Sequence, residues 1–375
     1  MDSRDRIAAI LNGEEPDQVG FQDADFFADT IGEWHTQGLP SNIDTAAGAL
    51  GPWLNVRGLR HFQSDIYVTW PDISLKYDVI DYEVGNDWKI MKDAYGTTTK
   101  WWTEKSGTPQ YLEPIVKAPE DFEKKVKPLL DARDMRRVSG SHYPFRQELE
   151  HMIKHFQREF FVVAGIIGPL EYSMYLCGGL ARTLVFLMRN QDFMQYIFSS
   201  ISDFLASVCE RYIEAGVDGI WVFDDLGSRD RPFLSPALYE KLLKPAHQRI
   251  CETSRKKGLP GLFHSDGNVE SIIPQLLDAG FVALQPFQND VIDIRRVKEK
   301  YGSELTVMGG IDTRVLSSGD FDAIRKEVAS KISIAGKGGR YIVTSDGPIP
   351  PTVSLQSYQY FRKLVREYGK YPLKS

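Results

Sequence analysis

The polar stretch 264–268, which reads His-Ser-Asp-Gly-Asn, is the part of the sequence whose residue types and spacing best suit chemistry. It follows an apolar run and precedes a segment with apolar residues at helical spacing, so a strand ends and a helix begins there. His264 and Asp266 could bind a metal ion, or His264 could act as a general acid or base. Asp266 could equally cap the following helix, and for Asn268 a cap is the favoured interpretation.

A second polar pair, Asp224-Asp225, follows the apolar run 219–223. Two adjacent carboxylates can raise the pKa of one of them, which then acts as an acid or base, or they can bind a cation. Salt bridges to Arg229 or Arg231 are the alternative. Because side chains alternate along a strand, we expect one of the two carboxylates to face the catalytic end.

Two further carboxylates, Asp312 and Asp346, follow later strand candidates. Asp312 comes after Gly309-Gly310, where the absence of side chains permits the close approach of a ligand. It is equally suited to capping the next helix, and Asp346 has the same two interpretations. The predicted catalytic candidates are Asp224, Asp225, His264 and Asp312.

About forty irregular residues follow the first strand candidate, and they are rich in large aromatic and basic side chains. A loop of this length in a compact enzyme is commonly functional. Aromatic side chains can wall an apolar pocket, although each one alone is more often plain packing. We expect segments 30–62 and 77–102 to close together over the catalytic face. The predicted substrate-binding residues are Trp34, His35, Trp53 and Arg57.

Strand and helix patterns alternate along most of the chain, which indicates parallel strands with crossover helices. Polar residues at nearly every strand end favour a TIM (β/α)8 barrel, an α/β fold, over an open sheet. Segment 77–102 alternates with period two between Gly-containing turns, so we expect a small antiparallel β insertion within a single domain, 1–375. Seven barrel strands can be placed, and the eighth cannot. They are 18–23, 160–165, 219–223, 259–263, 282–284, 305–308 and 341–344.

Composition restricts the class of protein. The 375 residues are 42% apolar and 26% charged, with a net charge of −6, which is ordinary for a globular enzyme and argues against nucleic-acid binding. No apolar run could span a bilayer, and the N-terminus lacks the apolar core of a signal peptide, so a cytoplasmic location is expected. The three cysteines have no metal-like spacing.

Several of these motifs, in this order, resemble the uroporphyrinogen decarboxylase (URO-D) superfamily, whose fold is a TIM barrel. The resemblance covers about two thirds of the chain. It is closer to the branch of corrinoid-dependent methyltransferases than to true uroporphyrinogen decarboxylases. The stretches that carry it are 6–17, 224–227, 264–268, 309–312 and 345–347.

The two branches differ in residues that can be checked here. The decarboxylases have an N-terminal Gly-rich segment with arginines and a C-terminal-loop histidine; this chain has neither that segment nor a histidine in 345–347. The methyltransferases bind zinc through a His-x-Cys pair and a later Cys. His264 matches the histidine, Asp266 stands where the first Cys would be, and Asp346 is nearest to the second. The resemblance therefore implies zinc on His264, Asp266 and Asp346, a harder site suited to polarising an ether or alcohol oxygen.

The resemblance implies a methyltransferase or O-demethylase component that acts on a small methylated compound, with a methoxylated aromatic as the best candidate. Zinc is the expected cofactor, without a nucleotide, and a partner protein would supply the corrinoid. A homodimer is allowed, and neither nucleic acid nor membrane is an expected partner. The first alternative is a cofactor-free decarboxylase or lyase, with Asp224 or Asp225 as proton donor and Arg57 or Arg60 on a substrate carboxylate. The second is a non-catalytic barrel that binds a tetrapyrrole or a corrinoid partner.

Overall fold

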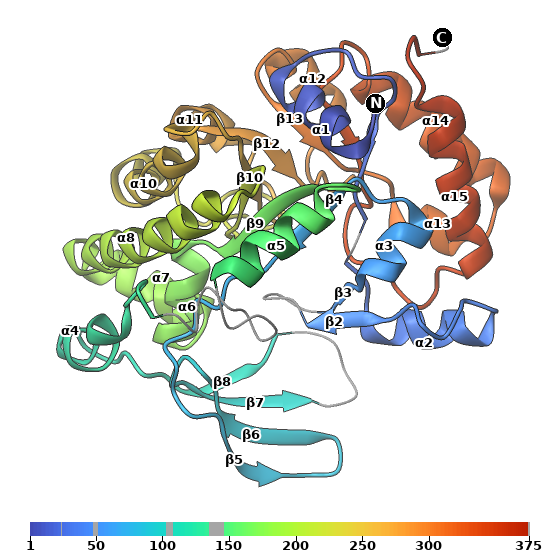
Figure 1. The fold of residues 1–375 in the computed structure, drawn as a ribbon. Helices are drawn as coiled ribbons and strands as arrows, with labels where there is room; N and C mark the ends of the chain where they lie inside the picture. The colour runs from blue at the N-terminus through green and yellow to red at the C-terminus, as the bar shows by residue number, and fades with distance from the viewer. Residues whose placement is uncertain (24, 48–51, 103–107, 135–145, 374–375) are drawn as a thin grey trace.

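The computed structural model describes residues 1–23, 25–47, 52–102, 108–134 and 146–373, and its central feature is a nearly closed barrel of eight parallel strands (Figure 1). The expected TIM barrel is confirmed. Its strands, in the order in which they pair, are β1 (Gly20–Phe21), β14 (Tyr341–Val343), β13 (Thr306–Met308), β12 (Phe281–Gln285), β11 (Gly261–His264), β10 (Gly219–Phe223), β9 (Phe161–Ile167) and β4 (Ile66–Thr69).

The eighth strand, which the sequence pattern did not place, is β4. It pairs in parallel with β9, and the Asp65 amide donates to the Phe21 carbonyl oxygen at 2.8 Å, so β4 also reaches β1. Only four residues long, β4 is followed by extended chain and an antiparallel sheet instead of a crossover helix. The strand-helix alternation that identified the other seven strands is therefore interrupted there.

Side chains of the barrel strands alternate between its interior and the surrounding helices. On β10, Trp221 and Phe223 belong to the interior cluster, whereas Ile220 and Val222 belong to the cluster beneath the helices. The helix α1 (Ser3–Asn12) contributes Ile7 and other residues to the interior cluster, so it covers the N-terminal end of the barrel. The carboxyl end is left for a functional site.

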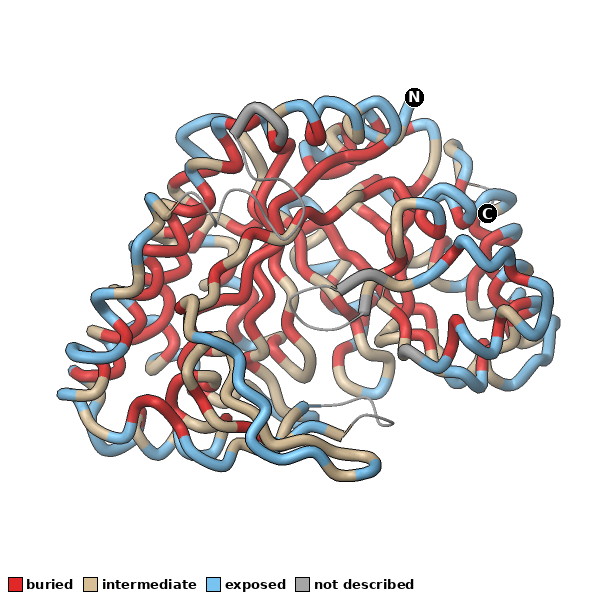
Figure 2. Tube along the Cα trace, turned by 60° about the horizontal axis from the view of Figure 1, so that its bottom comes forward, coloured by how far each residue is buried: buried red, intermediate tan, exposed pale blue. Residues whose placement is uncertain are grey.

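Helices surround the barrel, with their buried faces toward the strands and their exposed faces outward (Figures 1 and 2). Helix α8 (Gln191–Ala215) ends at Gly216 (φ 104°) and α11 (Ile273–Ala279) at Gly280 (φ 109°), both in the left-handed conformation that favours glycine at a helix end. The other principal helices are α2 (Ala28–Thr36), α3 (Val56–Phe62), α5 (Arg146–Phe156), α6 (Pro169–Cys177), α7 (Leu180–Arg189), α10 (Lys244–Arg255), α12 (Ile294–Tyr301), α13 (Thr313–Ser317), α14 (Phe321–Ala335) and α15 (Leu355–Tyr368), with short turns α4 (Pro119–Asp121) and α9 (Pro236–Leu238).

Between β4 and β9 the chain forms a separate antiparallel sheet, which Figure 1 shows standing off one side of the barrel. The antiparallel insertion expected at 77–102 is present, and its sheet of four strands extends beyond that segment to Glu113. The ring of Tyr95 lies 5.3 Å from that of Tyr172 and 5.2 Å from that of Tyr175, both on α6, so this sheet packs on α6. Its strands are β5 (Ile80–Val84), β6 (Trp88–Lys92), β7 (Thr98–Trp102) and β8 (Gln110–Glu113), and a further hairpin joins β2 (Thr45–Ala47) to β3 (Pro52–Leu54).

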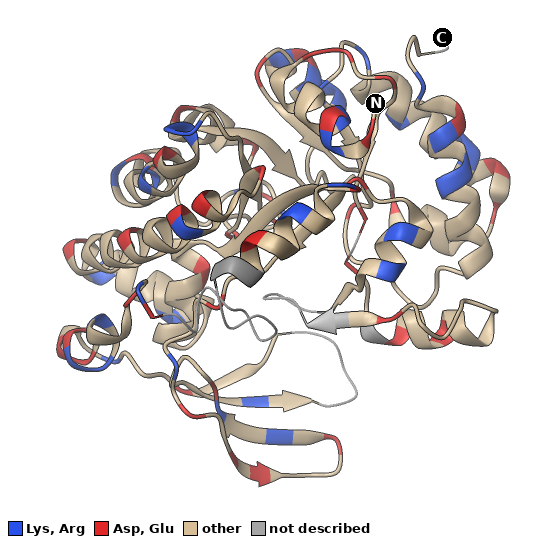
Figure 3. Ribbon diagram, in the orientation of Figure 1, with Lys and Arg blue, Asp and Glu red and all other residues tan. Residues whose placement is uncertain are grey.

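Charged side chains of both signs are interspersed along the outer helices (Figure 3). Within the described ranges, no helix combines the length and the apolar character that crossing a membrane requires. The cysteines Cys177, Cys209 and Cys251 are all buried and free.

Candidate metal centre

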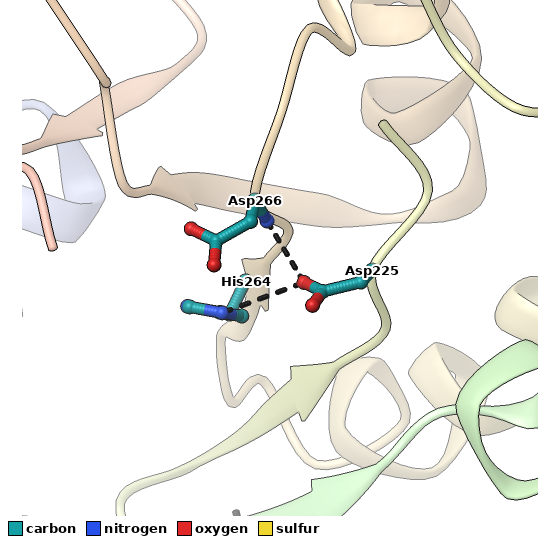
Figure 4. A group of neighbouring side chains, drawn as sticks. All are labelled: Asp225, His264 and Asp266. Carbon is teal, nitrogen blue, oxygen red and sulfur yellow. Dashed lines mark hydrogen bonds and ion pairs between the residues drawn. The ribbon is translucent and has the colours of Figure 1, made fainter. Parts of the chain in front are cut away.

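Three of the candidate residues, Asp225, His264 and Asp266, meet at the carboxyl end of the barrel (Figure 4). Strands β10 and β11 are neighbours in the sheet, and Phe223 pairs with His264. The Nε2 atom of His264 lies 3.6 Å from Oδ1 of Asp225, and that oxygen accepts a 2.8 Å hydrogen bond from the Asp266 amide. One potential ligand atom from each residue lies within 4.8 Å of the others. This spacing suits a shared cation.

The imidazole of His264 is oriented by Gln285, at the end of the next strand, β12. The Nδ1 atom of His264 hydrogen-bonds to Oε1 of Gln285, and an amide oxygen can only accept. Nδ1 therefore carries the hydrogen, and the Nε2 lone pair of a neutral imidazole faces Asp225. Metal-bound histidines have this arrangement, in which a hydrogen bond at the other nitrogen fixes ring and tautomer.

Two glycines allow the loops after β10 and β11 to lie against each other. A Cβ on Gly267 would come within 2.3 Å of the Gly227 backbone, and one on Gly227 within 2.6 Å of the Gly267 backbone. Gly267 also has φ 78°, a conformation that favours glycine. The same loop is held by Gln288, which accepts from the Gly267 amide at 2.9 Å and donates to Asp266 Oδ1 at 3.3 Å. The close approach of these loops places Asp225 and Asp266 side by side.

The site is crowded with carboxylates whose charge is unfavourable. Burial raises the pKa of Asp266, His264 lowers it, and Asp225 and Asp346 raise it further. Burial likewise raises the pKa of Asp25 to about 6, with a smaller contribution from Asp266. Burial, followed by the negative charges of Asp225 and Asp224, raises the pKa of Glu171 to about 8. A bound cation would relieve this like-charge repulsion.

Aromatic rings connect this centre to the segment that follows β1. The ring centroid of Phe223 lies 5.0 Å from His264, 5.0 Å from Trp70 and 5.9 Å from Trp53. Trp53 belongs to β3, and its backbone also bridges to Asp25. Below them, the indole nitrogen of Trp221 is buried without a hydrogen-bond partner. An apolar, aromatic wall therefore lies beside the imidazole.

The other predicted substrate-binding residues lie elsewhere. Trp34 is fully buried beside α15, where its indole N–H donates to the Val353 carbonyl oxygen at 2.8 Å. The Nε2 atom of His35 lies 2.8 Å from the Ile43 carbonyl oxygen, and Arg57 is an exposed residue on α3. Of that set of four, the structure brings Trp53 into the aromatic cluster next to His264.

Asp224 adjoins Asp225 in sequence but points the opposite way. Its carboxylate is fully buried and accepts from the amides of Leu170 at 3.2 Å and Glu171 at 2.7 Å. His247 adds a third contact, with Nε2 at 2.9 Å from Asp224. These contacts join the start of α6 to α10, so the geometry gives Asp224 a structural role.

Asp312 and Asp346 also have local partners. Asp312 caps α13, accepting from the Arg314 amide at 2.8 Å and from its guanidinium. Asp346 accepts from the amide and hydroxyl of Thr313, both at 3.0 Å, and from Asn289 at 3.1 Å. Within the part of the chain that the structure describes, Asp346 is near enough to affect Asp266 but is not one of the three grouped ligand candidates.

Three residues of the centre were not among the predicted site residues: Asp25, Glu171 and Gln285. Gln285 is the last residue of β12, Asp25 lies shortly after β1, and Glu171 lies in the first turn of α6, which follows β9. All three agree with the rule that the carboxyl ends of strands meet at the catalytic face. That rule was the available signal. Gln285 lacked a second indication, because a lone glutamine is not a typical metal ligand.

Comparisons with known proteins agree with this architecture. The family model described as uroporphyrinogen decarboxylase (URO-D) matches residues 85–368. The uroporphyrinogen decarboxylase of Hydrogenobaculum sp. (strain Y04AAS1) is 25% identical over 193 residues, 50% of this chain and 53% of that protein. The methylcobamide:CoM methyltransferase MtaA of Methanosarcina barkeri is 23% identical over 207 residues, 54% and 58% respectively. The chain thus aligns with little more than half the length of these curated relatives.

A solved structure described as a methyltransferase from Methanosarcina mazei has the same fold over nearly the whole chain. Its TM-score is 0.68 with 16% sequence identity, and the match covers 98% of this chain and 99% of that one. The resemblance inferred from motifs is confirmed by the family model, which spans well over half of the sequence. The chain belongs to the uroporphyrinogen decarboxylase (URO-D) family.

Proposed function

We propose that this protein is an enzyme that transfers a methyl group from a small methylated compound, a methoxylated aromatic in the first place, to the cobalt of a separate corrinoid protein. Zinc, held by Asp225, His264 and Asp266, is the proposed cofactor. The single observation that carries the proposal is the imidazole of His264, whose Nδ1 is fixed by Gln285 and whose Nε2 faces two carboxylates.

The donor set fits zinc. Imidazole nitrogen and carboxylate oxygen are both zinc ligands, and three protein ligands leave an open position for substrate. The hydrogen bond from Gln285 supplies the outer support that metal-bound histidines normally have. Bound there, zinc would polarise the oxygen from which the methyl group departs. Because the set contains no thiolate, it favours an oxygen ligand over a thiol.

The protein's own residues would orient the substrate. The cluster of Trp53, Trp70 and Phe223 offers ring faces and edges beside His264 to an aromatic methyl ether. The acidic groups around the centre disfavour anionic substrates and so also favour a neutral ether. The names of two relatives, the M. barkeri protein and the M. mazei structure, add support for methyl transfer as the class of reaction.

The decarboxylase alternative has less support from the geometry. It requires a cation for the substrate carboxylate, yet Arg60 forms a two-pronged pair with Glu159, which precedes β9 at the N-terminal end of the barrel. Its proton-donor candidate Asp224 is engaged in three hydrogen bonds. A multiply carboxylated porphyrinogen would also meet repulsion from the carboxylates at the carboxyl end.

The test uses zinc-loaded protein, cob(I)alamin as a surrogate acceptor and uncharged methoxybenzenes as donors. We expect conversion to methylcobalamin in the absorbance spectrum, together with release of the phenol. Asp225→Asn should abolish it, and His151→Ala, which removes an exposed histidine on α5, should leave it unchanged. Conversion of uroporphyrinogen to coproporphyrinogen by the same protein, with no methyl transfer, would overturn the proposal in favour of the decarboxylase.

A further inference from the structure

A cavity of about 380 Å³ lies at the N-terminal end of the barrel, the end opposite to His264. The residues just before β1, β4 and β9 line it, together with α1, α3 and α15. Its volume is within the range of small-molecule sites. Six charged side chains dominate the lining, namely Arg6, Arg60, Arg362, Arg366, Asp65 and Glu159. Four arginines against two carboxylates give the lining a formal charge of +2.

Both lining carboxylates already have arginine partners. Arg6 pairs with Asp65 at 2.8 Å, and its Nε pairs with Asp17 at 2.8 Å. Arg60 holds Glu159 with two hydrogen bonds of 2.7 Å. Two of the four guanidinium groups are therefore neutralised within the cavity wall.

The other two guanidinium groups, Arg362 and Arg366, lie one turn apart on α15. Among the residues that the structure describes, they hydrogen-bond only to neutral oxygens. Arg362 donates to the carbonyl oxygens of Phe62 at 2.8 Å and Gln63 at 3.1 Å, and Arg366 donates to the Gln63 side chain at 2.9 Å. Arg362 is only 3% exposed, and its Nη1 atom is buried with no hydrogen-bond partner. Like charges four residues apart on a helix repel each other, so an anion between them would be stabilising.

The electrostatic surroundings of Arg362 agree with a missing counter-ion. Burial and, to a smaller extent, the neighbouring Arg366 lower the pKa of Arg362 to about 9, against opposing contributions from Tyr358, Asp65 and Asp23. The carboxylates among these neighbours hydrogen-bond to other groups: Asp65 to Arg6 and the Phe21 amide, Asp23 to Ser345 and Tyr358. The guanidinium of Arg362 lies over the ring of Phe21, which provides a cation–π contact but no negative charge. A buried charge without a counter-ion is costly.

We propose that this cavity binds a phosphate group, as the free ion or as the phosphate of a small monoester, through Arg362 and Arg366. The planar guanidinium matches phosphate with two parallel hydrogen bonds, and two such groups match its double charge. A monocarboxylate would neutralise only half of the +2 lining. This site does not depend on the proposed methyl transfer, since it shares no residue with the centre at the other end of the barrel.

Isothermal titration calorimetry at constant ionic strength, in phosphate-free buffer, tests the site with orthophosphate, glycerol 3-phosphate and acetate. We expect one phosphate site per chain in the wild type. Arg366→Gln should weaken binding at least about 10-fold, the size expected for losing a charged hydrogen bond. Lys363→Gln is the matched control, because it removes the same charge from an exposed position of α15 that does not line the cavity. It should bind like the wild type.

Arg362→Gln should abolish phosphate binding, with circular dichroism used to verify the fold. If Arg362→Gln does not fold, Arg366→Gln decides the question, because Arg366 is exposed and its replacement does not disturb the core. Tighter binding of glycerol 3-phosphate identifies a monoester as the ligand, and binding of orthophosphate alone identifies the free ion; both support the site. Absence of phosphate binding to the wild type, equal weakening by Lys363→Gln and Arg366→Gln, or acetate binding as tight as phosphate would overturn the proposal.

Discussion

His264 and Asp225 end neighbouring parallel strands, and their Nε2 and Oδ1 atoms lie 3.6 Å apart. Because Nδ1 of His264 donates to Gln285, the group facing Asp225 is either the N–H of an imidazolium or a lone pair. A lone pair opposite a carboxylate is unfavourable unless a cation or a hydrogen-bond donor lies between them. The carboxylate of Asp266, which reaches the same point, favours the cation. The central claim is therefore that this is a metal centre.

The hydrogen bond from His264 to Gln285 should affect the affinity for metal but not the fold. We expect Gln285→Leu to weaken zinc binding by about 10- to 100-fold, because the imidazole loses the partner that fixes its tautomer. Competition with a chelating dye measures the affinity. Gln356→Leu, at an exposed position of α15, is the control and should retain wild-type affinity. Equal affinities in all three proteins would show that Gln285 does not support a ligand.

The adjacent residues Asp224 and Asp225 should separate stability from metal binding. Asp224→Asn weakens a buried contact with His247 and two amides, so we expect a loss of about 3 kcal/mol in unfolding free energy with metal retained. Asp225→Asn should lose the metal. The unfolding free energy of its metal-free form should equal that of the metal-free wild type. Urea denaturation and elemental analysis measure both. A stable Asp224→Asn protein that lacks metal would reverse the two assignments.

Two tryptophans of the same N-terminal segment should likewise behave differently. Trp53 contacts the aromatic cluster beside His264, so Trp53→Ala should raise the KM for an aromatic methyl ether while metal content stays constant. Trp34 is fully buried, so Trp34→Ala should cost about 3–5 kcal/mol of stability. Steady-state kinetics and thermal denaturation distinguish them. An unchanged KM in Trp53→Ala would remove this residue from the proposed substrate wall.

The buried carboxyl of Asp23 should make stability depend on pH. Burial raises its pKa to about 7, against opposing contributions from Ser345, Arg362 and Tyr358, whereas an unfolded chain has about 3.9. A carboxyl whose pKa is higher in the folded state contributes stability that is full below about pH 4 and is lost as the pH rises to about 7. The side chain of Asp23→Asn cannot ionise, so this variant does not lose that stability as the pH rises.

We therefore expect the difference in unfolding free energy between Asp23→Asn and the wild type to move in favour of the variant between pH 5 and pH 8. The expected change is on the order of 2 kcal/mol. Urea denaturation at the two pH values measures it. Parallel pH profiles for the two proteins would show that Asp23 does not titrate in this range.

Much of the fold could be predicted from the sequence, because apolar runs alternating with amphipathic helices are a local signal. The joints at Gly216 and Gly280 were visible as helix ends followed by buried strands. Strand β4 was not visible, since no crossover helix follows it.

The candidate site could be predicted only in part, because strand ends show which residues can meet but not which side chains turn inward. His264 and Asp266 share one loop and were paired from sequence. Choosing Asp225 over Asp224 required the register of β10 and β11. Gln285 and Asp25 come from other strands, and their approach to His264 follows from barrel closure, a long-range property that no local pattern contains.

The most direct measurement is the metal content of protein expressed with zinc in the growth medium and purified without chelator, determined by elemental analysis for wild type and His264→Ala. Our account predicts about one zinc per wild-type chain. His264→Ala should lose most of it and still fold, as circular dichroism would verify. A wild type free of metal, or a His264→Ala protein that keeps its zinc, would contradict the account.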